Sequence, residues 1–164
     1  MFHNMCFSSK VTTLDGRFLH CFEVGHSSNS IVATPETYGS GKEDGFNSLM
    51  VIGGEYMSGY KPDQGIREKQ ETDMNTSSQI HKLKYTFNGS LLYAACDGGK
   101  VKRYRRHADH HQYIGEVVSH KGDVCDLDIS PYDEFLVTAS KDKSVGVLCL
   151  GPPNHGWTGY CQLT

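Results

Sequence analysis

The feature that most constrains this chain is an internal repeat with an offset of 44 residues. Residues 83–104 (LKYTFNGSLLYAACDGGKVKRY) align without a gap on residues 127–148 (LDISPYDEFLVTASKDKSVGVL). Apolar positions coincide along the alignment, so that Leu92 meets Leu136. A repeat of this length indicates small β units that bury their apolar faces only by stacking on their neighbours. We therefore expect function on the rims and loops of the units.

The second repeat predicts three short strands. Residues 124–129 alternate between apolar and polar, which places Cys125 with Leu127 on the apolar face. Residues 135–139 (FLVTA) are apolar and partly β-branched, and this pattern predicts a strand that is buried on both faces. A third strand is predicted over residues 144–150.

The first repeat has the same order of strands, and residues 113–118 add a fourth strand before the second repeat begins. Four antiparallel strands per unit predict an all-β fold of propeller blades. Residues 1–25 are assigned to the end of a preceding blade, and residues 26–79 to a degenerate blade with a polar inserted loop at about 55–78. Residues 80–119 form the next blade, and residues 120–164 form the last blade with a C-terminal strand.

Composition argues against several classes of function. The net charge is -3 with a pI near 6.3, which gives no overall attraction to nucleic acid. No apolar run approaches the roughly 20 residues that span a bilayer, and no secretory signal is visible. Cys96, Cys125 and Cys149 fall in apolar strands, so we expect free, buried thiols in a reducing compartment. An intracellular protein, cytoplasmic or nuclear and without membrane contact, is predicted.

The second repeat resembles the WD repeat of β-propellers. In that family a His before the first strand, a Ser or Thr on the second, an Asp in the next turn and a Trp on the third form a buried network. The matching positions here are His120, Thr138 and Asp142, whereas Leu148 stands in place of the Trp. The resemblance covers residues 80–150 well and implies WD-type blades.

The length of the chain holds fewer than four repeats of 44 residues. Propellers usually have four to eight blades. We therefore expect an incomplete ring: part of a longer propeller, a truncated isoform, or a chain that assembles with further blades from another chain.

His120, Thr138 and Asp142 could also be interpreted as a catalytic triad. A threonine inside an apolar strand is poorly placed to meet a substrate, so we favour a structural network and predict no enzyme. The histidine-rich segment 107–111 (HADHH) matches no complete metal site, and a solvated loop is favoured there. No catalytic residue, metal or cofactor is expected.

The WD-repeat resemblance implies a scaffold that binds proteins or peptides through the loops of one rim. The predicted contacts in these loops are Asp97, Lys121, Asp123 and Lys141. The alternative is an RNA-associated module that uses the basic strand 100–106 (KVKRYRR). Strand alternation divides these charges between two faces, so an ordinary solvated strand end is favoured and nucleic-acid binding is not expected.

Overall fold

The computed structural model of the chain describes residues 8–12, 18–23, 27–33, 35, 50–55, 57–61, 65–70, 78–107, 110–150 and 160–163. In these ranges the chain forms strands joined by turns, with one 3₁₀ turn, η1 (Asp97–Gly99). The described residues contain no helix that is long and apolar enough to cross a membrane.

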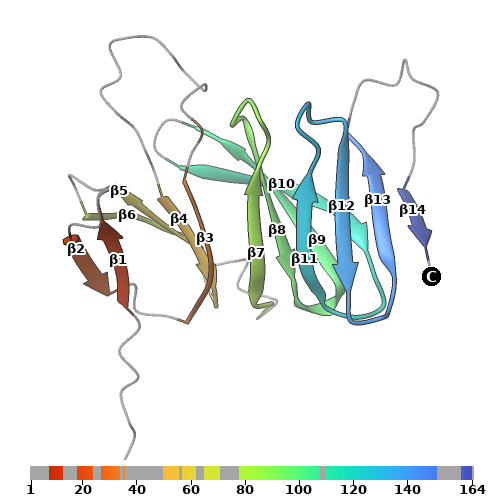
Figure 1. Ribbon diagram of the computed structural model, residues 1–164, viewed down its shortest axis with the longest axis horizontal. Coiled ribbons are helices and arrows are strands. Elements are labelled where there is room, and N and C mark those ends of the chain that lie inside the picture. Colours follow the sequence, from red (N-terminus) through yellow and green to blue (C-terminus); the bar gives the residue numbers. More distant parts are fainter. Residues whose placement is uncertain are drawn as a thin grey trace, which may run out of the picture.

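The described residues form three four-stranded sheets and one two-stranded sheet (Figure 1). Within each sheet the strands follow their order in the chain, and every pair is antiparallel. The all-β class and the four-stranded blades are therefore confirmed. The sheets consist of β1 (Ser8–Thr12) and β2 (Phe18–Glu23); β3 (Ser28–Ala33), β4 (Met50–Gly54), β5 (Met57–Lys61) and β6 (Gly65–Gln70); β7 (Ile80–Tyr85), β8 (Leu91–Cys96), β9 (Lys100–Arg106) and β10 (His111–Ser119); and β11 (Val124–Ile129), β12 (Phe135–Ser140), β13 (Val145–Cys149) and β14 (Tyr160–Leu163).

The four-stranded sheets stack side by side through their first strands. β7 lies against both β3 and β11 (Figure 1). One core, with Val51 and Leu83 among its members, joins the sheet β3–β6 to the sheet β7–β10. A second core, with Tyr93 and Leu127, joins the sheet β7–β10 to the sheet β11–β14. Burial of apolar area between the sheets is the main term that stabilises this arrangement.

The repeat seen in the sequence is also a repeat of backbone conformation. β7 and β11, and likewise β8 and β12, are offset by the same 44 residues. The turns after β7 and β11 place Gly89 (φ 69°) and Asp133 (φ 57°) in the left-handed region at equivalent positions. The turns after β8 and β12 do the same with Gly99 (φ 79°) and Lys143 (φ 70°).

A β-bulge interrupts the first strand of each four-stranded sheet and corrects one prediction. In β11 the register shifts between Val124 and Asp126, so Val124 rather than Cys125 joins Leu127 on the buried face. Cys125 is exposed, and its thiol is not the buried group that strict alternation predicted. β7 and β3 contain the same shift. In each strand the bulge inserts one extra residue, which reverses the direction of the side chains on one side of it.

The prediction of a polar inserted loop at about 55–78 is wrong. β5 and β6 lie within it and complete the sheet β3–β6. A β-ladder requires only backbone donors and acceptors. β6 is the outer strand and can do without the apolar side chains that mark a buried strand, whereas β5 supplies Met57 to the core. The segment's polar composition therefore concealed two strands.

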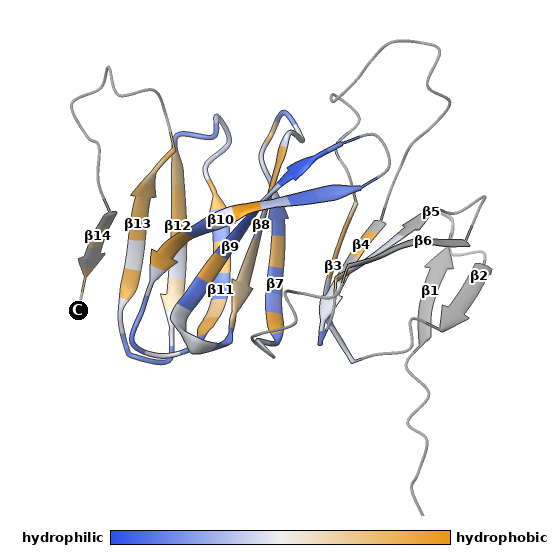
Figure 2. Cartoon of the chain, turned by 180° about the vertical axis from the view of Figure 1, so that it is seen from behind, coloured by the Kyte–Doolittle hydropathy of each residue, from blue (hydrophilic) through white to orange (hydrophobic). Residues whose placement is uncertain are grey.

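The prediction that residues 135–139 are buried on both faces is also wrong. Phe135 and Val137 are each 40% exposed, and Figure 2 shows much of β12 and β13 in the hydrophobic colour. The equivalent residues of β8, Leu91 and Tyr93, lie in the core between the last two sheets. No described sheet packs on the corresponding face of β12, so only one face of this strand is buried.

Two polar segments predicted to be solvated are buried in part. Lys102 is 2% exposed and Arg106 is buried, because β9 is an internal strand of a sheet that has a neighbouring sheet on each side. His111 is also buried, and its Nε2 lies 2.6 Å from the hydroxyl oxygen of Tyr85. β10 begins at this histidine, so the polar segment ends inside the sheet.

Candidate functional site

A buried polar network links the strands of the last sheet. The structure brings together His120, Thr138 and Asp142, the three residues matched to the WD repeat. Nε2 of His120 lies 2.8 Å from Oγ1 of Thr138, and Nδ1 lies 3.3 Å from Oδ2 of Asp142. His120 precedes β11, Thr138 is on β12 and Asp142 is in the following turn, so the imidazole connects three consecutive segments.

Ser144 is a fourth member of this network, which sequence reasoning missed. Its hydroxyl oxygen lies 2.9 Å from Nδ1 of His120, and the hydroxyl donates to Oδ1 of Asp142. The backbone amide of Ser144 also donates to Oδ1 of Asp142 at 2.9 Å. The available signal was the spacing Asp-x-Ser, which typically lets an aspartate accept hydrogen bonds two residues ahead in a turn.

The carboxylate of Asp142 is held in its ionised form. The hydroxyl of Ser144 is the main cause that lowers its pKa, and the backbone amides of Lys121 and Ser144 add to the effect. Charge-assisted hydrogen bonds of this kind favour the charged state and tie the loop before β11 to the turn after β12.

The burial of the network supports a structural role. Thr138 is 1% exposed and His120 is buried, so neither can reach a substrate in solution. Thr138 Oγ1 also lies 3.4 Å from the carbonyl oxygen of Gly146. Leu148, at the position of the Trp in the WD repeat, carries no donor for this hydroxyl and is half-buried beside the core between the sheets.

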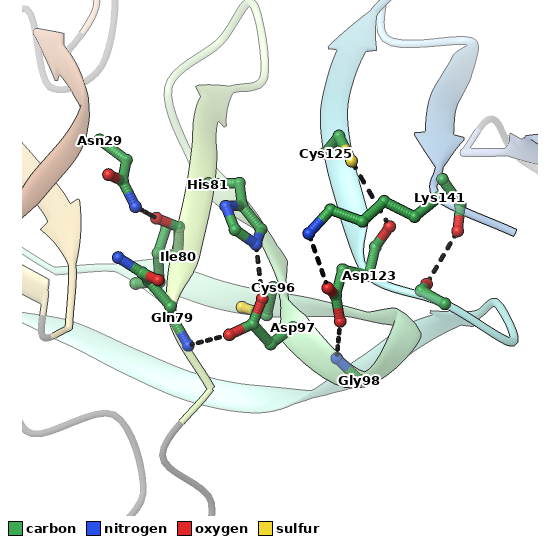
Figure 3. A network of polar contacts seen from close by, with 12 residues as sticks. Asn29, Gln79, Ile80, His81, Cys96, Asp97, Gly98, Asp123, Cys125 and Lys141 are labelled. Atoms are coloured by element: carbon green, nitrogen blue, oxygen red, sulfur yellow. Dashed lines mark hydrogen bonds and ion pairs between the residues drawn. The ribbon is translucent and has the colours of Figure 1, made fainter.

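Asp97, Asp123 and Lys141, three of the four predicted contacts, lie near one another on one rim (Figure 3). Oδ1 of Asp123 accepts the backbone amide of Gly98 at 2.9 Å, and Oδ2 lies 3.0 Å from Nζ of Lys141. Asp123 thus connects η1 of one blade to the turn between β12 and β13 of the next. The fourth predicted contact, Lys121, is exposed in the same loop, and its backbone amide donates to Asp142.

The electrostatics of this rim favour the ionised carboxylate of Asp123. The Gly98 amide is the main cause that lowers its pKa, followed by the hydrogen bond from Lys141. The same hydrogen bond to Asp123 raises the pKa of the Lys141 ammonium group, which favours its charged form. Both side chains remain partly exposed, so the pair is accessible to a partner molecule.

His81 completes this rim and was missed by the sequence analysis. It lies on β7, and its Nε2 is 2.6 Å from Oδ1 of Asp97. Ligand atoms of His81, Asp97 and Asp123 lie within 4.8 Å of one another, the one such group among the described residues. Asp97 also accepts the backbone amide of Gln79, and Asp123 is bound to Gly98 and Lys141. A cation would therefore have to displace existing bonds, and we interpret the group as a hydrogen-bonded junction.

The basic strand β9 does not present a continuous cationic face. Lys102 and Arg106 are buried, and Lys100 forms an ion pair with Glu116 at 3.0 Å. Arg105 is exposed. Single-stranded nucleic acid favours clustered charge with stacking rings on one surface, and this strand does not provide it.

Comparison with known proteins supports the fold. Residues 111–147 match the family described as "WD domain, G-beta repeat". Among solved structures, a chain of the crystal structure of the Mitotic Checkpoint Complex superposes with a TM-score of 0.60 at 13% sequence identity. The alignment covers 75% of this chain and 37% of that chain, so this chain corresponds to little more than a third of its length. No curated protein matches the sequence significantly.

Proposed function

We propose that this chain, which has a WD-type propeller fold and matches the WD-repeat family over residues 111–147, is a non-catalytic scaffold that binds other proteins through the loops of one rim. WD-repeat propellers are generally not enzymes, and the histidine and threonine of the His120 network are both buried. The structurally similar chain is part of a protein complex, which agrees with protein partners in general. An intracellular location belongs to the same proposal.

The observation that carries the proposal is the junction at Asp123. Its carboxylate joins η1 of one blade to Lys141 of the next, so loops from two blades form one surface. Exposed charges held in fixed positions steer a complementary partner and give salt-sensitive binding. The exposed ammonium groups of Lys121 and Lys141 are the expected contacts for acidic groups on that partner.

Charge reversal on the rim tests the proposal. Proteins captured from a cell extract by the wild-type chain would be identified, purified and measured by calorimetry at several salt concentrations. We expect Lys121→Glu and Lys141→Glu to weaken the interaction and to reduce its dependence on salt. Arg105→Glu is the matched control, because it reverses one exposed charge at the opposite end of the blade. Equal binding by the double variant Lys121→Glu/Lys141→Glu would contradict the assignment.

A further inference from the structure

A cleft between the last two blades lies at the end opposite the charged rim. Its volume is about 400 Å³. It opens beside the β7–β8 and β11–β12 turns, which lie side by side at the top of Figure 1. The two turns are joined directly, since the backbone amide of Phe87 donates to Oδ1 of Asp133 at 2.6 Å. Its lining includes Leu91, Tyr93, Arg103, Val117, Leu148 and Leu150.

Arg103 lines the cleft and carries one unsatisfied donor. Its Nε is buried and has no hydrogen-bond partner. The side chain also bonds with that of Tyr93, which is itself buried in the wall of the cleft. Asp133 lines the cleft as well, but its carboxylate accepts the amide of Phe87. A buried N–H without an acceptor is unfavourable, and a carboxylate is the acceptor that a guanidinium binds best.

One wall of the cleft is apolar, whereas Thr86, Asn88 and Ser90 of the β7–β8 turn line its polar side. Leu91, Val117, Leu148 and Leu150 border the core between the two blades and line the cleft. Leu148 occupies the position that holds a Trp in the WD repeat, and its smaller side chain fills less of the space between the blades. Apolar clefts that contain a few polar groups are the usual form of a binding site for a side chain or small ligand.

Two exposed aromatic rings lie on the turns beside this cleft. Phe87 is 67% exposed on the β7–β8 turn, and Tyr132 is 84% exposed on the β11–β12 turn. Large exposed rings are enriched where proteins bind one another, because they bury much area with little loss of entropy.

We propose that this cleft binds a peptide segment of a partner protein in which an acidic side chain is next to an apolar one. The carboxylate binds Arg103, the apolar side chain packs on Leu148 and Leu150, and the peptide backbone passes between Phe87 and Tyr132. This site uses none of the residues of the charged rim, so either site can fail in experiment without the other.

Two matched peptides test the proposal: acetyl-Gly-Leu-Asp-Phe-Gly-amide and the same sequence with Asn in place of Asp. Binding is followed by NMR of isotopically labelled Leu and Val methyl groups. We expect the Asp peptide to cause saturable shifts at Leu91, Val117, Leu148 and Leu150. The Asn peptide should bind at least about tenfold more weakly than the Asp peptide, because it lacks the charge-assisted bond.

Three variants sharpen the test. Arg103→Gln should reduce binding of the Asp peptide to the level of the Asn peptide, whereas Lys143→Gln, which removes one positive charge at the other rim, should have no effect. Leu148→Trp should fill the cleft, block both peptides and raise the midpoint of thermal unfolding. Equal binding of the two peptides by the wild type, or shifts confined to other methyl groups, would overturn the proposal. Concentration-dependent shifts at these methyl groups without peptide would also overturn it, since a second copy of the chain would then occupy the cleft.

Discussion

The backbone amide of His120 donates to the carbonyl oxygen of Gly99 at 2.8 Å, so the residue that organises the last blade is also bonded to the preceding one. Gly99 lies so close to His120 that a Cβ atom placed on it would be 2.0 Å from the carbonyl oxygen of His120. The junction between the blades therefore requires a residue without a side chain at this position.

Substitution of this glycine should be strongly destabilising. Gly99→Ala combines a left-handed backbone with a clash against backbone atoms, and we expect a loss of about 3 kcal/mol or more in the free energy of unfolding. Gly98→Ala is the control, because Gly98 has φ 69° but nothing within 4 Å of the added atom. It should lose only about 1 kcal/mol. Urea unfolding would measure both values, and equal losses would show that the close approach to His120 is not a constraint.

Acid should weaken the network of the last blade through Asp142. The pKa of this carboxyl is lowered in the folded state, so its contribution is complete above the unfolded value near 3.8 and is lost as the pH falls below it. The difference in unfolding free energy between wild type and Asp142→Asn should therefore be large at pH 7 and shrink below pH ~4.

The control for this prediction is Glu134→Gln, which removes an exposed carboxylate from a turn of the same blade. We expect it to change stability little at any pH. A constant difference between wild type and Asp142→Asn from pH 7 down to pH 3 would show that the ionised carboxylate is not what stabilises the network. Should Asp142→Asn fail to fold, the titration of Asp142 followed by NMR in the wild type would test the same point.

The repeat was the part of this structure that sequence could predict. Leu83 and Leu127 are equivalent apolar residues 44 positions apart, and both are buried where one blade packs on the next. An apolar pattern that recurs at a fixed offset therefore predicts stacked blades. The approach of His120, Thr138 and Asp142 was implied by the resemblance of the second repeat to the WD repeat. These inferences use local pattern alone and require no knowledge of what surrounds each sheet.

The sequence did not predict features that depend on neighbours. The bulge that buries Val124 and exposes Cys125 leaves no mark in a pattern of alternating residues. The contact of His81 with Asp97 joins a strand to a turn sixteen residues away. The equivalent positions of the second repeat hold Cys125 and Lys141, so the repeat does not reveal this pair. Exposure of Val137 reflects which face a second sheet covers, which is a property of the assembly rather than of the strand.

The bulge predicts a difference in thiol reactivity. Burial raises the pKa of Cys96 to about 12, which leaves on the order of a few thousandfold less thiolate than an ordinary cysteine with a pKa of ~8.5. Cys125, the bulged residue of β11, is exposed. In the native protein at pH 8, iodoacetamide should therefore label Cys125 and leave Cys96 unmodified, as measured by mass spectrometry of the digested chain.

Denaturation provides the control for this labelling experiment. In urea both thiols should react at similar rates, because burial no longer suppresses the thiolate of Cys96. Rapid native labelling at Cys96 would show that the core between the first two four-stranded sheets, to which this residue belongs, opens readily.

The buried ammonium group of Lys102 predicts a stabilising substitution. Its Nζ is buried and has no hydrogen-bond partner, and the residue is only 2% exposed. A buried charge without a partner is unfavourable, and its replacement by an apolar side chain of similar length removes that penalty. Lys102→Met should therefore raise the free energy of unfolding by about 1 to 4 kcal/mol. Lys143→Met, at an exposed turn, is the control and should change it by less than about 0.5 kcal/mol. Urea unfolding at pH 7 compares the two variants, and a loss of stability in Lys102→Met would show that the ammonium group serves a bond within the folded chain.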